Sequence, residues 1–228
     1  MYYGEYFLYV LIPTLIISGA VRLYMSNAFG KWGKVRNGSG LTGAQVANAI
    51  YQRTGLNPVP LKPIPGTLTD HYDPANNVVG LSQAVGGGNS VVSMAVTAHE
   101  LGHVQQKQQG SGLMALRQFL VPAVRISPAI SYLLIIGGLI FNFLGLAWLG
   151  VIVFGVSVIF MLITVPVELD ASRRAIKLLE EAGLLVTEDD RSGAKTVLRA
   201  AALTYVAAAV TSILTLLYYI SLVQRSRR

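Results

Sequence analysis

The stretch FLVPAVRISPAISYLLIIGGLIFNFLGLAWLGVIVFGVSVIFMLITVPV, residues 119–167, is almost entirely apolar and contains one charged side chain, Arg125. It is too long for a single membrane crossing, because a helix of about 20 residues spans a bilayer. The sequence Phe141-Asn142-Phe143-Leu144-Gly145 interrupts the run near its middle and favours a tight turn. The stretch therefore predicts a transmembrane hairpin. Arg125 is expected to snorkel to the interface or to mark where the first helix of the hairpin begins.

Two more apolar runs lie near the ends of the chain. The first predicted span lies in residues 1–24 and contains the apolar run Phe7–Val21. No Lys or Arg precedes this run, which favours a retained anchor helix over a cleaved signal peptide. Residues 200–228 contain the run Ala200–Val223 and end in a basic tail. Tyrosines flank the first run as in an interfacial aromatic belt, namely Tyr2, Tyr3, Tyr6 and Tyr24. With 53% hydrophobic and 13% charged residues and a mean hydropathy of +0.53, the chain is predicted to be a mostly α integral membrane protein with four transmembrane helices.

Residues 25–118, between the first two predicted spans, have the composition of a small water-exposed domain. Leu41–Gly55 is amphipathic, with Thr42 placed to cap the start of a helix and Gly55 placed to end it. The proline-rich Asn57–Gly66 is expected to break regular structure. This region therefore predicts a small α+β unit, whose remaining elements carry the chemistry.

A β-hairpin is predicted immediately before the most informative motif. Leu68–Tyr72 and Val78–Ser82 are strand-like and flank Asp73-Pro74-Ala75-Asn76-Asn77, which favours a turn. An edge strand beside a catalytic helix can hold an extended peptide by strand addition.

The motif is His99-Glu100-Leu101-Gly102-His103. Gly86–Ser90 is a loop that ends in good helix caps, and Val91–Ala98 is an apolar run that leads into the motif, so the motif is predicted to lie within a helix. Residues four apart on a helix share one face, so both imidazoles can reach one zinc ion. Glu100 is then placed to accept the proton of a water that zinc activates and to pass it to the leaving amine.

A zinc site needs a third protein ligand, and the chain has no cysteine and one further histidine, His71, so carboxylates are the remaining choice. Glu168 is the favoured candidate because the predicted hairpin crosses the membrane twice and returns this residue to the side of His99. Small residues on its helical face, Ala171, Ser172 and Ala175, would let two helices approach closely. Residues 168–199 are thus predicted to form a helix with this ligand, followed by an exposed loop. The other downstream carboxylates are Asp170 and five that are expected to be solvated: Glu180, Glu181, Glu188, Asp189 and Asp190.

The combination of an anchor, the His99–His103 motif, a transmembrane hairpin and Glu168-Leu169-Asp170-Ala171-Ser172 resembles the membrane-bound gluzincin peptidases related to HtpX. That group has an aspartate where this chain has Ser172, so the role of the aspartate beside the metal ligands is not carried over. The chain more closely resembles the YugP-like neutral zinc metallopeptidases of bacteria. The resemblance implies a membrane peptidase with a zincin-like α+β catalytic unit, one zinc ion, and His99, His103 and Glu168 as ligands. The further stretches that carry it are GLTGA at 40–44, LTDHYDP at 68–74 and Ala200–Ala209.

His71 is a second candidate catalytic residue, on the predicted hairpin. A lone histidine in a strand is commonly structural. Asp70 and Asp73 could fix its tautomer, and His71 could then stabilise the oxyanion of a peptide intermediate or bind zinc as an extra ligand.

The net charge of +7 does not indicate nucleic-acid binding, because no basic stripe with interleaved aromatic residues is present. With four spans, all but three of the 18 Lys and Arg residues lie on or near the side of the motif, between Arg22 and Arg199. The positive-inside rule then predicts a multi-pass protein of the plasma membrane with its active site facing the cytoplasm, although the basic C-terminal tail opposes this orientation.

The same residues allow three other functional classes, of which one is disfavoured and two stay open. An intramembrane protease is disfavoured because the polar sequence Val104–Gly110 follows the motif. A zinc-stabilised membrane scaffold or protease adaptor would use the same ligands without needing Glu100. A hydrolase of another acyl group would use the same water. Expected partners are protein or peptide substrates and the lipid bilayer, with a homo-oligomer or a membrane protease complex as further alternatives.

Overall fold

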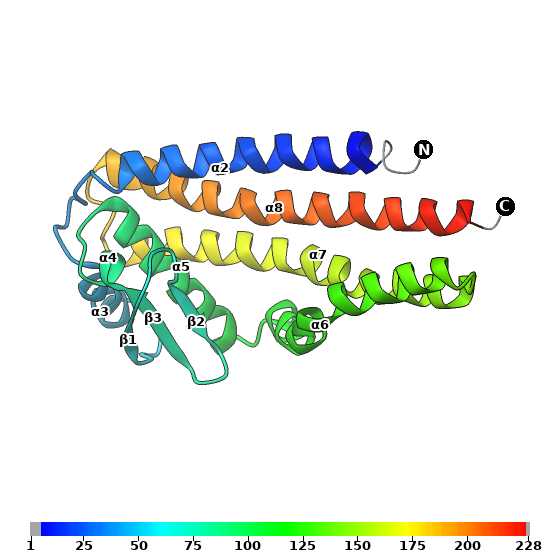
Figure 1. Ribbon diagram of the computed structural model, residues 1–228. Helices are drawn as coiled ribbons and strands as arrows, with labels where there is room; N and C mark the ends of the chain where they lie inside the picture. Colours follow the sequence, from blue (N-terminus) through cyan, green and yellow to red (C-terminus); the bar gives the residue numbers. More distant parts are fainter. Residues whose placement is uncertain (1–5, 227–228) are drawn as a thin grey trace. The chain divides into compact units, whose positions relative to one another are not determined.

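The computed structural model describes residues 6–226, which leaves the predicted belt residues Tyr2 and Tyr3 outside the described part. The chain forms two compact units, a helical unit of Met1–Val21, Leu113–Pro166 and Thr204–Arg228, and a site unit of Arg22–Gly112 and Val167–Leu203. Within the described residues, four helices are long and apolar enough to cross a membrane, and a three-stranded sheet lies between the first two of them in the sequence (Figure 1). The chain is thus a mostly α membrane protein with a small α+β part, as predicted.

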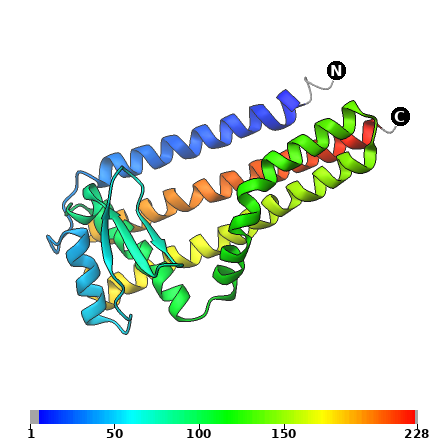
Figure 2. The ribbon, with the colours of Figure 1, turned by 60° about the horizontal axis from the view of Figure 1, so that its bottom comes forward.

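The helical unit contains the predicted hairpin, made of α6 (Gly112–Ile140) and α7 (Leu144–Glu181) (Figure 2). The chain reverses at Phe141–Phe143, where Asn142 has a φ of 52°, a conformation that asparagine tolerates better than most residues. Ile135 of α6, Ala147 and Val151 of α7 and Val223 of α8 (Glu188–Arg225) form a buried cluster. Apolar packing therefore joins three helices of this unit.

All four of these long helices extend beyond the apolar runs that predict them, and α6 begins at Gly112, before residue 119. A π-helical turn, η1 (Phe7–Leu11), leads into α2 (Ile12–Trp32), which continues well past residue 24. In the same way α7 continues past residue 167, and α8 begins before residue 200. Hydropathy marks where a helix leaves the bilayer, whereas the backbone hydrogen bonds of the helix can continue into water.

The site unit begins with α3 (Gly43–Arg53), which has the predicted cap. Thr42 accepts from the backbone N–H of Gln45, and the Gln45 side chain accepts from the N–H of Thr42. The face with Val46 and Ile50 is fully buried.

The sheet has the order β1-β3-β2. β2 (His71–Asp73) and β3 (Val78–Ser82) pair antiparallel as the predicted hairpin does, but the first strand is shorter than the predicted Leu68–Tyr72 and begins at His71. Leu68 has a φ of 56°, which excludes it from a strand. β1 (Leu61–Ile64) pairs parallel to β3 within the segment that was predicted to lack regular structure, so that prediction is wrong. Pro63 is tolerated because β1 is an edge strand: the carbonyl of Pro60 faces β3, and alternation turns Pro63 away from it, where no N–H is needed.

The segment around residue 190 also differs from its prediction as an exposed loop. Glu180, Glu181, Glu188 and Asp189 are exposed, but Asp190 is fully buried. Its carboxylate accepts hydrogen bonds from the N–H groups of Gly38 (2.9 Å), Val186 (3.1 Å) and Thr187 (2.8 Å). A buried carboxylate needs such donors, and the start of α8 and the loop after α2 provide them.

Candidate metal centre

The helix α5 (Val91–Gln108) carries the motif and is built as the sequence predicts. Ser90 caps it by accepting from the N–H of Ser93 at 3.1 Å. The rings of His99 and His103 lie one turn apart, with their centroids 4.8 Å from each other and their planes at 82°. The other side of α5 packs against α3, α4 (Gln83–Gly86) and the strands β2 and β3, which fixes its position in the unit.

The site-unit part of α7 approaches α5 at Gly102, the residue before His103. A Cβ at Gly102 would lie 2.5 Å from the carbonyl oxygen of Ala171, so only glycine allows this contact. Ala171 and Ala175 are fully buried, which confirms the predicted role of small residues on this face of α7. The close approach brings Glu168 to the two histidines.

Among the described residues, His99, His103 and Glu168 form a group that could hold a metal ion, with their ligand atoms all within 4.8 Å of one another. The Oε2 atom of Glu168 lies 3.2 Å from Nε2 of His99 and 3.5 Å from Nε2 of His103. Ligands at the usual zinc distance of about 2.0–2.1 Å in a tetrahedron lie roughly 3.3–3.4 Å apart. The spacing and the His, His, carboxylate donor set therefore fit zinc.

Each histidine uses its other ring nitrogen to bind a neighbour. Nδ1 of His103 lies 2.9 Å from Oε1 of Gln106, and Nδ1 of His99 lies 3.3 Å from Oγ of Ser172. Such partners of metal-binding histidines fix the orientation of the rings. Ser172 thus contacts the first histidine although it is not an aspartate. The sequence analysis missed Gln106, whose position three residues after His103 on the same helix face was the available signal.

Glu100 and His103 are both buried, and the carboxylate influences the imidazole. Burial lowers the pKa of His103, but the hydrogen bond with Glu168 and the charge of Glu100 raise it more, so the net pKa is above its ordinary value. Glu100 is 6% exposed and His103 is 7% exposed, whereas the side chain of His99 is 14% exposed. The site is therefore shielded, and it is most open to solvent at His99.

His71 is not part of the group of three. It lies on the edge strand β2 opposite Gly80, and its ring would be 3.2 Å from a Cβ at that glycine. Its Nδ1 lies 2.8 Å from the carbonyl oxygen of Thr69. Asp70 binds the N–H and hydroxyl of Ser82, and Asp73 accepts from the turn residues Ala75 and Asn76, so both carboxylates have other hydrogen-bond partners. The catalytic role of His71 stays a prediction.

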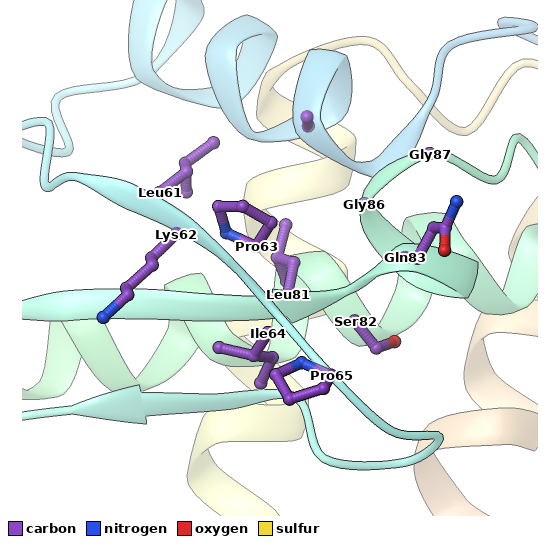
Figure 3. A pocket seen from close by; sticks show the side chains of 11 residues that line it. Leu61, Lys62, Pro63, Ile64, Pro65, Leu81, Ser82, Gln83, Gly86 and Gly87 are labelled. Carbon is purple, nitrogen blue, oxygen red and sulfur yellow. The ribbon is translucent and has the colours of Figure 1, made fainter.

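A cavity of about 630 Å³ lies along β1 and is lined by residues of β1, β3 and α4, with its apolar side chains mainly from β1 (Figure 3). Pro63, Ile64 and Leu81 contribute to its wall, together with Lys62. None of the three candidate metal ligands lines it. The cavity is thus a feature of the sheet and separate from the metal centre.

Comparison with known proteins gives matches over nearly the whole chain. Residues 7–224 match a protein family described as "Putative neutral zinc metallopeptidase". A Bacillus subtilis (strain 168) protein described as "Putative membrane protease YugP" is 40% identical over 221 residues, which cover 97% of this chain and 98% of that protein. No solved structure matches the chain.

Proposed function

Because the chain belongs to the family described as "Putative neutral zinc metallopeptidase", we propose that it is a membrane-bound zinc metalloendopeptidase that hydrolyses peptide bonds in membrane-associated or misfolded proteins. The observation that carries the proposal is the convergence of two imidazole Nε2 atoms on one buried carboxylate oxygen, 3.2 and 3.5 Å away. A glutamate, Glu100, lies beside the first histidine in the sequence.

His99, His103 and Glu168 would hold one zinc ion. When bound there, zinc would lower the pKa of a water and polarise the scissile carbonyl. The three side chains come from two helices, so α5 and α7 together define the site. Three protein ligands leave the fourth tetrahedral position open, as catalytic zinc sites require.

Glu100 would act as the general base. It would accept the proton of the attacking water and later transfer it to the leaving amine, a role worth about 10²–10⁴-fold in rate. Its burial in α5 supports this role, because charge interactions are stronger where water is excluded. A site that serves only to hold the fold together has no need of such a group.

An extended substrate would pair with β2. The sheet has two edges, and the outer edge of β1 carries Pro63, which has no N–H to offer. β2 is the other edge and packs against α5. Strand addition at β2 would therefore bring a peptide next to the helix that bears the histidines.

His71 would take part from this same edge strand, as a donor to the substrate oxyanion or as an additional ligand. The support is its place on β2 and its exposure. In the His71→Ala variant we expect lower turnover, measured on a protein substrate, with zinc content as the second readout. If both stay at the level of the parent protein, His71 has no catalytic role.

The protein would lie in the plasma membrane with the site facing the cytoplasm, because most of its positive charge lies on the side of the site. The chain contains no cysteine, so a single Gln109→Cys substitution at the exposed end of α5 gives one labelling position. In intact cells we expect a membrane-impermeant maleimide to leave this cysteine unlabelled until the membrane is opened. Labelling of intact cells would reverse the orientation.

The second candidate function is a zinc-stabilised scaffold or protease adaptor, whether alone, as a homo-oligomer or within a protease complex. The decisive comparison is between the parent protein and Glu100→Gln, purified in detergent, with zinc content and cleavage of an unfolded reporter protein as readouts. A peptidase predicts that the variant keeps its zinc and loses at least about 100-fold in cleavage rate. Equal behaviour of the two proteins in both assays favours the scaffold.

A further inference from the structure

Gln106 lies at the centre of a hydrogen-bonded chain that connects a metal-binding histidine to α7. The side chain is 1% exposed. Its Nε2 donates to the carbonyl oxygen of Val167 at 2.8 Å and to Oδ2 of Asp170 at 2.9 Å. Its Oε1 lies 2.9 Å from Nδ1 of His103. All three of these contacts connect Gln106 to the surroundings of the metal centre.

The partners of Gln106 determine which way its amide faces. A backbone carbonyl and an ionised carboxylate can only accept hydrogen bonds, so they require the NH₂ group of the amide on their side. Asp170 forms an ion pair with Arg174, whose Nε lies 2.6 Å from Oδ2, and this ion pair favours the ionised carboxylate. A flipped amide would turn its oxygen to two acceptors. The carbonyl oxygen of Gln106 must therefore face His103.

The orientation of this amide in turn fixes the tautomer of His103. Because Oε1 of Gln106 can only accept, Nδ1 of the neutral imidazole must carry the proton. Nε2 then has the free lone pair, and Nε2 is the atom that lies 3.5 Å from Oε2 of Glu168. The tautomer that the chain selects is thus the one that can bind a metal at the site.

Gln106 also affects the position of the third ligand. Val167, whose carbonyl accepts from Gln106, directly precedes Glu168 in α7. One buried side chain therefore holds the ring of His103 and the backbone next to Glu168 in a fixed relation.

From these contacts we infer that Gln106, oriented by Asp170 and Arg174, is a positioning residue that holds His103 in its metal-binding tautomer and holds α7 at the distance that Glu168 needs. The inference deepens the proposed function and rests on the same metal site. The partner of His103 is thus a neutral amide, that of Gln106. The charged group that orients this amide is the carboxylate of Asp170.

The first test compares Gln106→Leu with the matched control Gln108→Leu in the full-length protein in detergent. Gln108 is the last residue of α5, and its exposed side chain bonds to the backbone N–H and carbonyl of Asn57, away from the chain that contains Asp170 and Arg174. Chelator competition should show zinc affinity about 10–100-fold weaker in Gln106→Leu, as for other partners of metal-binding histidines. The control should stay within about twofold of the parent protein, and thermal melts of the zinc-stripped proteins show whether both variants fold.

A spectroscopic readout separates positioning from a merely structural role. The chain has three histidines, so ¹⁵N-histidine labelling gives three imidazole spin systems. In the zinc-stripped protein at about pH 9, where imidazoles are neutral, His103 should carry its proton on Nδ1 in the parent protein and in Gln108→Leu. In Gln106→Leu the two tautomers should both be populated. An unchanged tautomer or an unchanged zinc affinity in Gln106→Leu overturns the inference.

A second test exchanges the amide of Gln106 and the carboxylate of Asp170. It keeps the size of the side chains and so leaves no cavity in the core. In Gln106→Glu the new carboxylate faces Asp170, and zinc affinity should fall. Adding Asp170→Asn to it supplies an amide that can donate to the new carboxylate, and zinc affinity should recover at least about tenfold relative to Gln106→Glu. A double variant no tighter than the single one contradicts the role of Asp170. None of these readouts uses turnover, so a parent protein that binds zinc and cleaves nothing refutes the proposed peptidase and leaves this inference standing.

Discussion

Two carboxylates of the site unit are almost fully buried, and their surroundings differ in kind. Asp190 is 0% exposed and accepts from three backbone N–H groups, those of Gly38, Val186 and Thr187. Glu168 is 2% exposed and faces the ring nitrogens of His99 and His103. Backbone N–H groups are permanent donors, whereas an imidazole can exchange a proton for a metal ion. The partners of a buried carboxylate therefore show whether it serves the fold or a site.

The two carboxylates also differ in their position within their helices. Asp190 completes a capping box with Thr187 at the start of α8, and its bond to Gly38 ties the loop after α2 to that helix. Glu168 lies far from either end of α7, where it cannot cap. Its buried carboxylate instead meets two imidazoles of another helix, α5.

The largest expected effect comes from neutralising each carboxylate in turn. Glu168→Gln should weaken zinc binding more than about 100-fold, beyond the effect of an outer partner. Asp190→Asn should leave zinc affinity unchanged and lower the free energy of unfolding by about 2–4 kcal/mol, because a charged acceptor of three N–H groups is lost. Chelator competition and chemical unfolding of the zinc-stripped proteins measure the two quantities.

The two variants act as controls for each other. Each protein is measured in both assays, and Asp190→Asn should shift the melting temperature of the zinc-stripped protein more than Glu168→Gln does. If Asp190→Asn loses zinc as strongly as Glu168→Gln, the division between a structural and a functional carboxylate does not hold.

The next effect tests how Glu168 reaches the histidines. In Gly102→Ala the new methyl group would lie 2.5 Å from the carbonyl oxygen of Ala171, so α5 and α7 must move apart. Such overpacking costs about 1–3 kcal/mol and should weaken zinc binding by at least about tenfold. Gly30→Ala is the matched control, because nothing lies within 4 Å of a Cβ there. Equal zinc affinity in both variants would show that the metal site tolerates a wider helix spacing.

Much of this comparison could be predicted from the sequence where the signal is local. Two histidines four apart, an apolar run and a turn sequence predict the motif helix and the hairpin, and the even number of crossings selects Glu168. Asp190 was predicted to be solvated because its acidic neighbours are, although Thr187-Glu188-Asp189-Asp190 has the spacing of a capping box. The bond to Gly38 joins residues 152 apart, and no sequence pattern shows it.

The other missed features depend in the same way on neighbours in space. β1 forms because β3 lies beside it. Pro63 is compatible with a strand only because β1 lies at the edge of the sheet. Gln106 is visible as a neighbour of His103 on α5, but its importance depends on Val167 and Asp170 of α7. Helix ends past the apolar runs depend on packing that hydropathy does not measure.

A smaller effect is expected at the neutral partner of the first histidine. Ser172→Ala removes the hydroxyl that lies 3.3 Å from Nδ1 of His99, and zinc affinity should fall by about tenfold, at the low end for such partners because the contact is long and uncharged. Ser221→Ala is the matched control, because it also removes a helix hydroxyl, one that donates to the carbonyl oxygen of Tyr218 in its own helix. A loss of more than about 100-fold in Ser172→Ala would mean that the hydroxyl does more than orient the ring.

The smallest effect concerns the partly buried phenol of Tyr51 in the site unit. It donates to the carbonyl oxygen of Val59 at 3.4 Å, and burial raises its pKa to about 12. The folded protein therefore keeps this proton while the unfolded chain releases it above its ordinary pKa of about 10, so stability is lost as the pH rises from about 10 towards 12. Tyr51→Phe should reduce that alkaline loss, measured as the difference in melting temperature between about pH 8 and pH 11. An unchanged alkaline loss in Tyr51→Phe would show that burial of Tyr51 is not its cause.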